Sequence, residues 1–174
     1  MQFPSWVSLP LTFASIFFGS DLLTLQHLNN LYRIPMAMYP EYMVAPIRED
    51  LTSAGFEQLM TPEEVEQAVT SEGTVLVAVN SVCGCAAAKA RPALKMAVAS
   101  ASKKPAKLVT VFAGMEQDAV AKAREHMLPY PPSSPSIALF KDGELVHMIE
   151  RYHIEGNELN RIVDNLQGAF ESYC

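Results

Sequence analysis

Three short runs of apolar and often β-branched residues predict buried strands. They cover residues 74–80, 107–113 and 136–140. Unbroken apolar runs of this length are typical of strands in a sheet that is covered on both faces. A fourth strand is expected over residues 145–150, because the Asp142-Gly143 pair before it favours a tight hairpin turn.

Segments with helical signals separate these runs. Thr61 can cap a helix, Pro62 suits its first turn and Glu64 completes a capping box, so a helix should run from there to about residue 72 and end at Gly73. Apolar spacing and composition predict further helices over residues 86–101, 115–127 and 159–170.

Two prolines and one glycine are expected to interrupt or end predicted helices. An early helix over residues 41–55 should be interrupted at Pro46 and stopped by Gly55. Pro92 lies inside the predicted helix over residues 86–101, where it should either kink the axis or break the helix.

The predicted order is strand, helix, strand, helix, strand, strand, helix. Crossover helices require the first strands to run parallel, and the hairpin adds an antiparallel edge. The pattern therefore predicts an α/β sandwich, with helices on both faces of a mixed sheet that contains one antiparallel hairpin.

Composition fits one such domain with an appendage. The chain has 174 residues, of which 49% are hydrophobic, enough to bury a core without covalent cross-links. Its formal net charge of −6 argues against a nucleic-acid-binding protein, which would present a basic surface.

The first 37 residues differ from the rest, since residues 1–35 carry only two charged side chains, Asp21 and Arg33. The apolar run over residues 7–18 is shorter than the roughly 20 residues of a membrane span, and no Lys or Arg precedes it as in a secretory signal. We expect residues 1–37 to be a disordered extension or a mis-assigned start, with a signal or anchor as the less favoured alternative. The folded domain should cover residues 38–174.

The candidate chemistry lies in Cys83-Gly84-Cys85, between the strand over residues 74–80 and the following helix. A helix N-terminus stabilises a thiolate, so the pKa of Cys83 should fall below the reference of about 8.5. Cys85 is the natural resolving thiol, and Gly84 permits the backbone bend that the two sulfur atoms need to meet. A one-residue spacer closes a small, strained ring, so we expect a transient disulfide that is easily reduced.

Two other interpretations of the cysteines stay open. Free cysteines are often buried structural residues. A zinc ion needs three or four ligands, and the pair supplies two. The side chains that could complete such a site are Cys174, His126, His147 and His153. Cys174, the final residue, could alternatively be a spare thiol that forms mixed disulfides.

Pro135 follows Ser134 and opens the strand over residues 136–140, a position that a buried strand allows to proline. A cis Ser134–Pro135 bond would turn the chain tightly and offer backbone groups to a bound disulfide. The alternative is the commoner trans form in an ordinary loop.

Several of these segments resemble the bacilliredoxin family of thioredoxin-like proteins. They are residues 79–86 (VNSVCGCA), 91–93 (RPA), 111–114 (VFAG), 132–136 (PSSPS) and 151–156 (RYHIEG). The resemblance covers residues 39–174 and implies a thioredoxin-like three-layer sandwich with Pro135 as the cis-proline. The motif has one residue between its cysteines where thioredoxin has two, so a thioredoxin-like potential does not follow.

The resemblance further implies a cytoplasmic thiol–disulfide oxidoreductase that removes bacillithiol from mixed disulfides on client proteins. Cys83 would attack the bacillithiol sulfur, and Cys85 or a second bacillithiol would resolve the adduct. Gly84, Ser134 and Pro135 would contact substrate, with bacillithiol as co-substrate and no metal, cofactor, nucleic acid or membrane involved. The alternatives are a general disulfide isomerase or reductase and a non-catalytic metal-binding domain.

Overall fold

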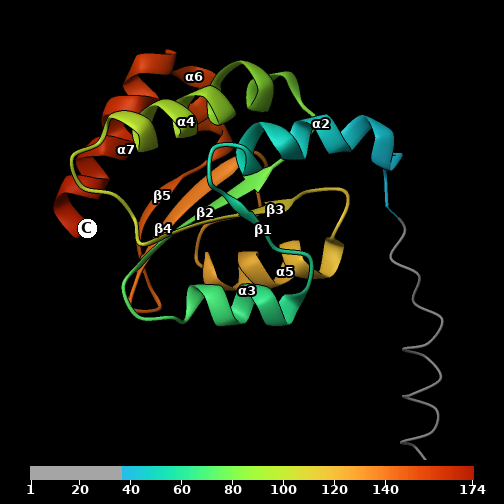
Figure 1. The fold of residues 1–174 in the computed structure, drawn as a ribbon, viewed down its shortest axis with the longest axis horizontal. Helices are drawn as coiled ribbons and strands as arrows, with labels where there is room; N and C mark the ends of the chain where they lie inside the picture. The colour runs from blue at the N-terminus through green and yellow to red at the C-terminus, as the bar shows by residue number, and fades with distance from the viewer. Residues whose placement is uncertain (1–36) are drawn as a thin grey trace, which may run out of the picture. The chain divides into compact units, whose positions relative to one another are not determined.

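A five-stranded mixed sheet forms the centre of the computed structural model, which describes residues 37–174 (Figure 1). The strand order across the sheet is β1-β3-β2-β4-β5. The strands are β1 (Glu57–Gln58), β2 (Thr74–Asn80), β3 (Lys107–Phe112), β4 (Ser136–Lys141) and β5 (Glu144–Ile149). The expectations for residues 1–36 lie outside the described residues.

Helices cover both faces of this sheet. They are α2 (Glu41–Thr52), α3 (Pro62–Val69), a π-helical turn η1 (Ala86–Ala90), α4 (Arg91–Ser100), α5 (Gln117–His126), α6 (Arg151–Gly156) and α7 (Leu159–Tyr173). Helices α2, α4, α6 and α7 lie on one face, and α3 and α5 lie on the other (Figure 1). None of the helices within residues 37–174 combines the length and the apolar character needed to cross a bilayer.

Two strand pairings agree with the sequence prediction, since β2 pairs in parallel with β3 and β4 pairs with β5 in the predicted hairpin. β4 also runs antiparallel to β2, a pairing that the sequence pattern did not predict. Asp142 and Gly143 form its turn with φ angles of 52° and 85°, the left-handed conformations that a two-residue hairpin turn requires. The predicted α/β sandwich is confirmed, and its strand order is that of a thioredoxin-like fold.

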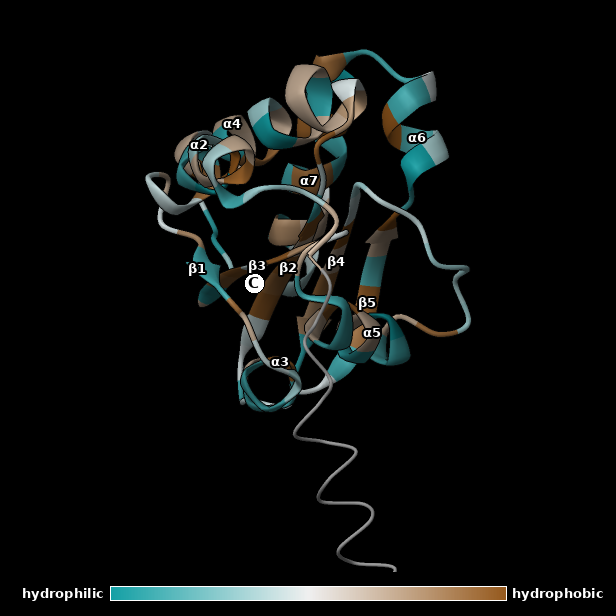
Figure 2. Cartoon of the chain, turned by 90° about the vertical axis from the view of Figure 1, so that its right-hand side faces the viewer, coloured by the Kyte–Doolittle hydropathy of each residue, from teal (hydrophilic) through white to brown (hydrophobic). Residues whose placement is uncertain are grey.

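β2 is buried along its whole length because its side chains pack into two hydrophobic cores, one on each face of the sheet. Leu76 and Ala78 pack with α4 and α7, and the alternate residues Val75, Val77 and Val79 pack with α3 and α5. Figure 2 shows the hydrophobic colouring concentrated on the central strands and on the helix faces turned toward them. A strand with this double burial must be apolar at every position, which explains the unbroken run in the sequence.

The capping box at Thr61 is present as predicted. The Glu64 amide donates to the Thr61 hydroxyl at 3.2 Å, and the Thr61 amide donates to the Glu64 carboxylate at 3.1 Å. The helix ends at Val69 rather than near residue 72, because the chain turns before Gly73 takes a φ of 87°.

Both prolines that were expected to disturb helices are accommodated. Pro46 lies within a continuous α2 rather than interrupting it, because it lies on the solvent side, where water can serve the carbonyl that loses its partner. Pro92 lies in the first turn of α4, directly after the π-helical turn in which the Arg91 amide donates to the Ala86 carbonyl. The helical run therefore continues past Pro92 instead of breaking.

Candidate active site

Cys83 lies three residues beyond the end of β2, where the helical run begins. Buried β2 fixes one end of this turn and Ala86, fully buried in the helix, fixes the other. Cys83 and Cys85 are both half-buried free thiols, and Gly84 between them is exposed. A Cβ atom placed on Gly84 would meet no other atom within 4 Å, so the approach to the pair is open on that side.

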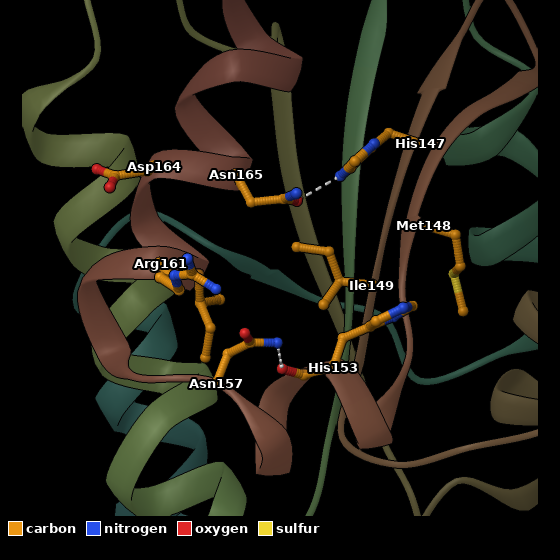
Figure 3. Close-up of a pocket in the computed structure, with 9 residues that line it drawn as sticks. His147, Met148, Ile149, His153, Asn157, Arg161, Asp164 and Asn165 are labelled. Atoms are coloured by element: carbon orange, nitrogen blue, oxygen red, sulfur yellow. Dashed lines mark hydrogen bonds between the residues drawn. The ribbon is translucent and has the colours of Figure 1, made fainter.

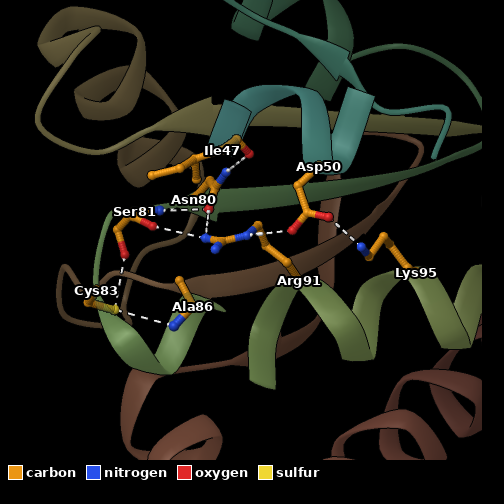
Figure 4. A network of polar contacts seen from close by, with 8 residues as sticks. All are labelled: Ile47, Asp50, Asn80, Ser81, Cys83, Ala86, Arg91 and Lys95. Atoms are coloured by element: carbon orange, nitrogen blue, oxygen red, sulfur yellow. Dashed lines mark hydrogen bonds and ion pairs between the residues drawn. The ribbon is translucent and has the colours of Figure 1, made fainter. Parts of the chain in front are cut away.

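Three donors surround the Cys83 sulfur. The Ser81 hydroxyl donates to it at 3.2 Å and the Ala86 amide at 3.4 Å (Figure 4), and the Cys85 thiol also donates to it. Burial raises the pKa of the Cys83 thiol, but these hydrogen bonds and the positive charge of Arg151 outweigh burial and lower it. The pKa shift has the direction expected from the helix N-terminus.

The pKa of Cys85 shifts in the opposite direction. Burial, its hydrogen bond to Cys83 and the negative charge of the Cys83 thiolate raise the pKa of Cys85 to about 11. One thiol of the pair is therefore prepared to be a thiolate while its neighbour holds a proton. Such an asymmetry suits successive attack by two sulfurs.

A cavity of about 570 Å³ opens beside Cys83. Ser81, Ser134 and Arg151 line it together with Cys83, and the Ser134–Pro135 bond is cis, as the resemblance implied. The Arg151 guanidinium donates to the Ser134 carbonyl at 3.2 Å, which links the cis-proline loop to α6. The structure thus brings Cys83 and Ser134 to one cavity, with Pro135 buried behind them.

Sequence reasoning missed the role of Arg91, a buried cation beneath the thiol turn. Its guanidinium donates to the Asn80 side chain at 3.2 Å, to the Ser81 carbonyl at 3.1 Å and to the Asp50 carboxylate at 2.8 Å (Figure 4). The Asn80 side-chain oxygen also accepts from the Ser81 amide at 2.8 Å. These contacts fix the backbone that carries the Ser81 hydroxyl to Cys83.

Arg151 and Glu155 on α6 form a second group that the sequence did not indicate. The Arg151 guanidinium donates to the Glu155 carboxylate at 2.8 Å. This hydrogen bond, together with one from the Cys85 thiol, lowers the pKa of Glu155. Lys89 holds α6 in place by donating to the carbonyls of Glu155 at 2.9 Å and Asn157 at 2.8 Å.

The structure does not assemble the residues proposed for a metal site. Within residues 37–174, no group of three or more His, Cys, Asp or Glu side chains is arranged to hold a metal ion. His126 contacts Glu66, His147 contacts Asn165, and His153 accepts from the Glu150 amide. Cys174 packs against the core cluster beneath α4 and α7.

A larger cavity, of about 680 Å³, lies between β5, α6 and α7 (Figure 3). His147 and Asn165 meet across it at 2.7 Å, and the Asn157 side chain donates to the His153 carbonyl at 2.8 Å. None of the three cysteines lines this cavity. This cavity is therefore not the site of the thiol chemistry, although it is the larger of the two.

The chain is similar to a family and to individual proteins whose names agree with a thiol–disulfide site. The family described as "Disulphide isomerase" matches residues 39–174. A bacilliredoxin of Cytophaga hutchinsonii is 53% identical over 134 residues, which is 77% of this chain and 98% of the relative. A bacilliredoxin of Halalkalibacterium halodurans is 54% identical over 140 residues, which is 78% of this chain and 96% of the relative.

Solved structures similar to the chain include thioredoxins. A mutant thioredoxin of Halobacterium salinarum has a TM-score of 0.47 at 18% identity and covers 67% of this chain and 88% of its own. Mitochondrial thioredoxin 3 of Saccharomyces cerevisiae has a TM-score of 0.47 at 16% identity and covers 67% of this chain and 98% of its own.

The thiol pair, the sheet topology and the relatives define a thiol–disulfide oxidoreductase with a thioredoxin-like fold. More particularly, the chain belongs to the bacilliredoxin family.

Proposed function

We propose that this oxidoreductase acts in the cytoplasm and removes bacillithiol from mixed disulfides on client proteins. The observation that carries the proposal is the asymmetric thiol pair at an open cavity, with Cys83 stabilised as a thiolate and Cys85 holding its proton. The choice of bacillithiol is supported by the relatives, which bear the name bacilliredoxin.

In the first step the Cys83 thiolate attacks the bacillithiol sulfur of the mixed disulfide. A sulfur–sulfur bond forms between Cys83 and bacillithiol, the client sulfur–sulfur bond breaks, and the client leaves as a thiolate that takes a proton from water. Ser81 and the Ala86 amide hold the attacking charge before the transfer. Ser134 faces the mixed disulfide with Pro135 buried behind it, and the open side of Gly84 admits the client chain.

In the second step the adduct is resolved. Cys85, whose thiol donates to the Glu155 carboxylate, loses its proton along this hydrogen bond to water and then attacks the Cys83 sulfur. A Cys83–Cys85 disulfide forms, bacillithiol leaves as a thiolate, and a low-molecular-weight thiol later reduces the strained ring. Alternatively, a second bacillithiol attacks the bound bacillithiol, which yields bacillithiol disulfide and restores the Cys83 thiolate.

Mass spectrometry of the protein after reaction with a bacillithiolated client tests the mechanism. Cys85→Ser should accumulate one bacillithiol on Cys83 and release the client thiol, whereas Cys83→Ser should release none. Release of the client thiol by Cys83→Ser at the wild-type rate would show the assignment to be wrong.

A general disulfide isomerase is the second candidate, because the matching family carries that description. Reactivation of a scrambled disulfide protein, measured beside removal of bacillithiol and of glutathione from one client, separates the two. Equal rates with both adducts, together with efficient reactivation, would favour the isomerase.

A further inference from the structure

We infer that Arg124 forms an anion-binding subsite in the Cys83 cavity and binds a carboxylate of the low-molecular-weight thiol during transfer. The inference rests on the proposed function and names the part of the site that would recognise the small thiol rather than the client.

Arg124 lies on α5 and shares the lining of the 570 Å³ cavity with Cys83, Ser134 and Arg151. Its Nε atom is shielded from solvent and has no hydrogen-bond partner within residues 37–174. A shielded donor without an acceptor is destabilising and rare in native structures, so Arg124 stands out as a guanidinium that the described chain does not hold at this atom.

Two other arginines of the described chain, both with side chains about 10% exposed, are neutralised. Arg48 pairs with Glu116 and Arg91 pairs with Asp50. Arg124 has no ion pair with a carboxylate of the described chain, and burial alone lowers its pKa. Its positive charge therefore remains available to a ligand.

The cavity suits an anionic small molecule. Among residues 37–174, no Asp or Glu lines it, whereas two arginines do, and one of these, Arg151, already shares its charge with Glu155. Its volume lies within the range of about 300–1,000 Å³ of small-molecule sites. A guanidinium binds a carboxylate with two parallel hydrogen bonds, and the malyl group of bacillithiol carries carboxylates. A ligand joined through sulfur to Cys83 would have its acid group drawn to Arg124.

Steady-state kinetics of thiol release from one neutral peptide tests the subsite. The peptide carries either bacillithiol or uncharged 2-mercaptoethanol as its mixed-disulfide partner. Arg124→Gln should raise KM for the bacillithiol adduct roughly tenfold or more, since hydrogen bonds to charged groups are lost, and leave KM for the uncharged adduct unchanged. Arg124→Lys should restore part of the affinity.

The control is Arg161→Gln, which removes an exposed arginine from the larger cavity and should change neither KM. The rate at which iodoacetamide alkylates Cys83 should also be unchanged in Arg124→Gln, because the thiol keeps its three donors. An equal loss with both adducts would assign Arg124 a structural role and overturn the subsite.

A second peptide, acidic and carrying 2-mercaptoethanol, distinguishes the source of the carboxylate. If Arg124→Gln weakens only this substrate, the arginine recognises clients and the inference is wrong. A wild-type protein that cannot release bacillithiol would refute the proposed function, and the subsite with it. Normal release that is insensitive to Arg124→Gln would refute the subsite alone.

Discussion

At the scale of single residues, the Ser81 hydroxyl is the side chain that tunes the attacking thiol. It donates directly to the Cys83 sulfur, and it is buried at the end of the turn that Arg91 holds. A donor favours the charged form of its acceptor, so its removal must raise the pKa of Cys83.

Ser81→Ala should therefore shift the pH midpoint of Cys83 alkylation upward by about one unit, the equivalent of one hydrogen bond to a charged group. The alkylation rate of Cys85→Ser protein as a function of pH measures this midpoint. Ser172→Ala, which removes a hydroxyl bonded to the Gly168 carbonyl on α7, is the control and should not move it. An unchanged midpoint in Ser81→Ala would mean that the amide of Ala86 and the remaining charges set the pKa alone.

Glu155 gives a second prediction at this scale, because it contacts the thiol that must lose a proton. Glu155→Gln should slow formation of the Cys83–Cys85 disulfide about tenfold, below the usual range for loss of a full general base because the Glu155 carboxylate is only weakly basic, while the first transfer keeps its rate. Rapid-quench mass spectrometry should show the Cys83 adduct persisting. Glu158→Gln, a nearby substitution with no contact to the thiols, serves as the control. An unchanged rate of disulfide formation in Glu155→Gln would mean that Cys85 loses its proton directly to water, without Glu155.

At the scale of elements, Asp50 joins α2 to α4 under the active-site turn. It pairs with Arg91 and Lys95, and the hydrogen bond from Lys95, with that from Arg91, lowers the pKa of the Asp50 carboxyl. A lowered folded-state pKa contributes stability above the unfolded value, and the contribution disappears as pH falls through the folded one.

Asp50→Asn should cost about 1–3 kcal/mol in the free energy of unfolding at pH 7, since it leaves the buried Arg91 charge without its carboxylate, although Asp50 itself is partly exposed. Urea unfolding measures the loss. The difference from wild type should shrink as pH falls below about 4, because the unfolded carboxyl then binds a proton before the folded one does, and it should vanish once the folded carboxyl is also protonated. Glu125→Gln, which breaks the exposed pair with Lys122, should cost less than about 1 kcal/mol. A pH-independent difference would exclude the ion pair as the cause.

The helices and strands differ in how well they could be predicted from the sequence. β2, the capping box at Thr61 and the hairpin at Asp142 were predictable, because each follows from local burial or local hydrogen bonds. β1 and α6 were missed, since two and six residues are too short to show a period. The Asp50–Arg91 contact joins positions 41 residues apart, and no spacing rule reveals such a pair.

The site was predictable to the same extent. Cys83 and Cys85 stand out through their position between a buried strand and a helix, and the contact between the two thiols contributes to their opposite pKa shifts. Glu155 and Arg124 reach the site from helices on opposite faces of the sheet, so only the folded chain brings them near the thiols. The roles assigned to Gly84, Ser134 and Pro135 stay predictions.

At the scale of the whole molecule, β2 ties two hydrophobic cores into one folding unit. Leu76 is fully buried among α4 and α7, and Val77 is fully buried among α3 and α5, although the two residues are neighbours on one strand. Loss of either core therefore exposes the strand that organises the other. The two helical layers should open together rather than one at a time.

Hydrogen exchange after Leu76→Ala measures this coupling. A buried leucine truncated to alanine costs about 2–5 kcal/mol, and the slowest amides of α5, on the opposite face of the sheet from the Leu76 side chain, should lose as much protection as those of α7. Met96→Ala, at a partly exposed position on α4, should change protection by less than about 0.5 kcal/mol. A loss confined to α7 would mean that the layers open independently, and the thiol turn between β2 and η1 could then open while the opposite core stays folded. An equal loss on both faces ties the opening of the thiol turn to unfolding of the whole sheet, so that Cys83 keeps its three donors for as long as the chain is folded.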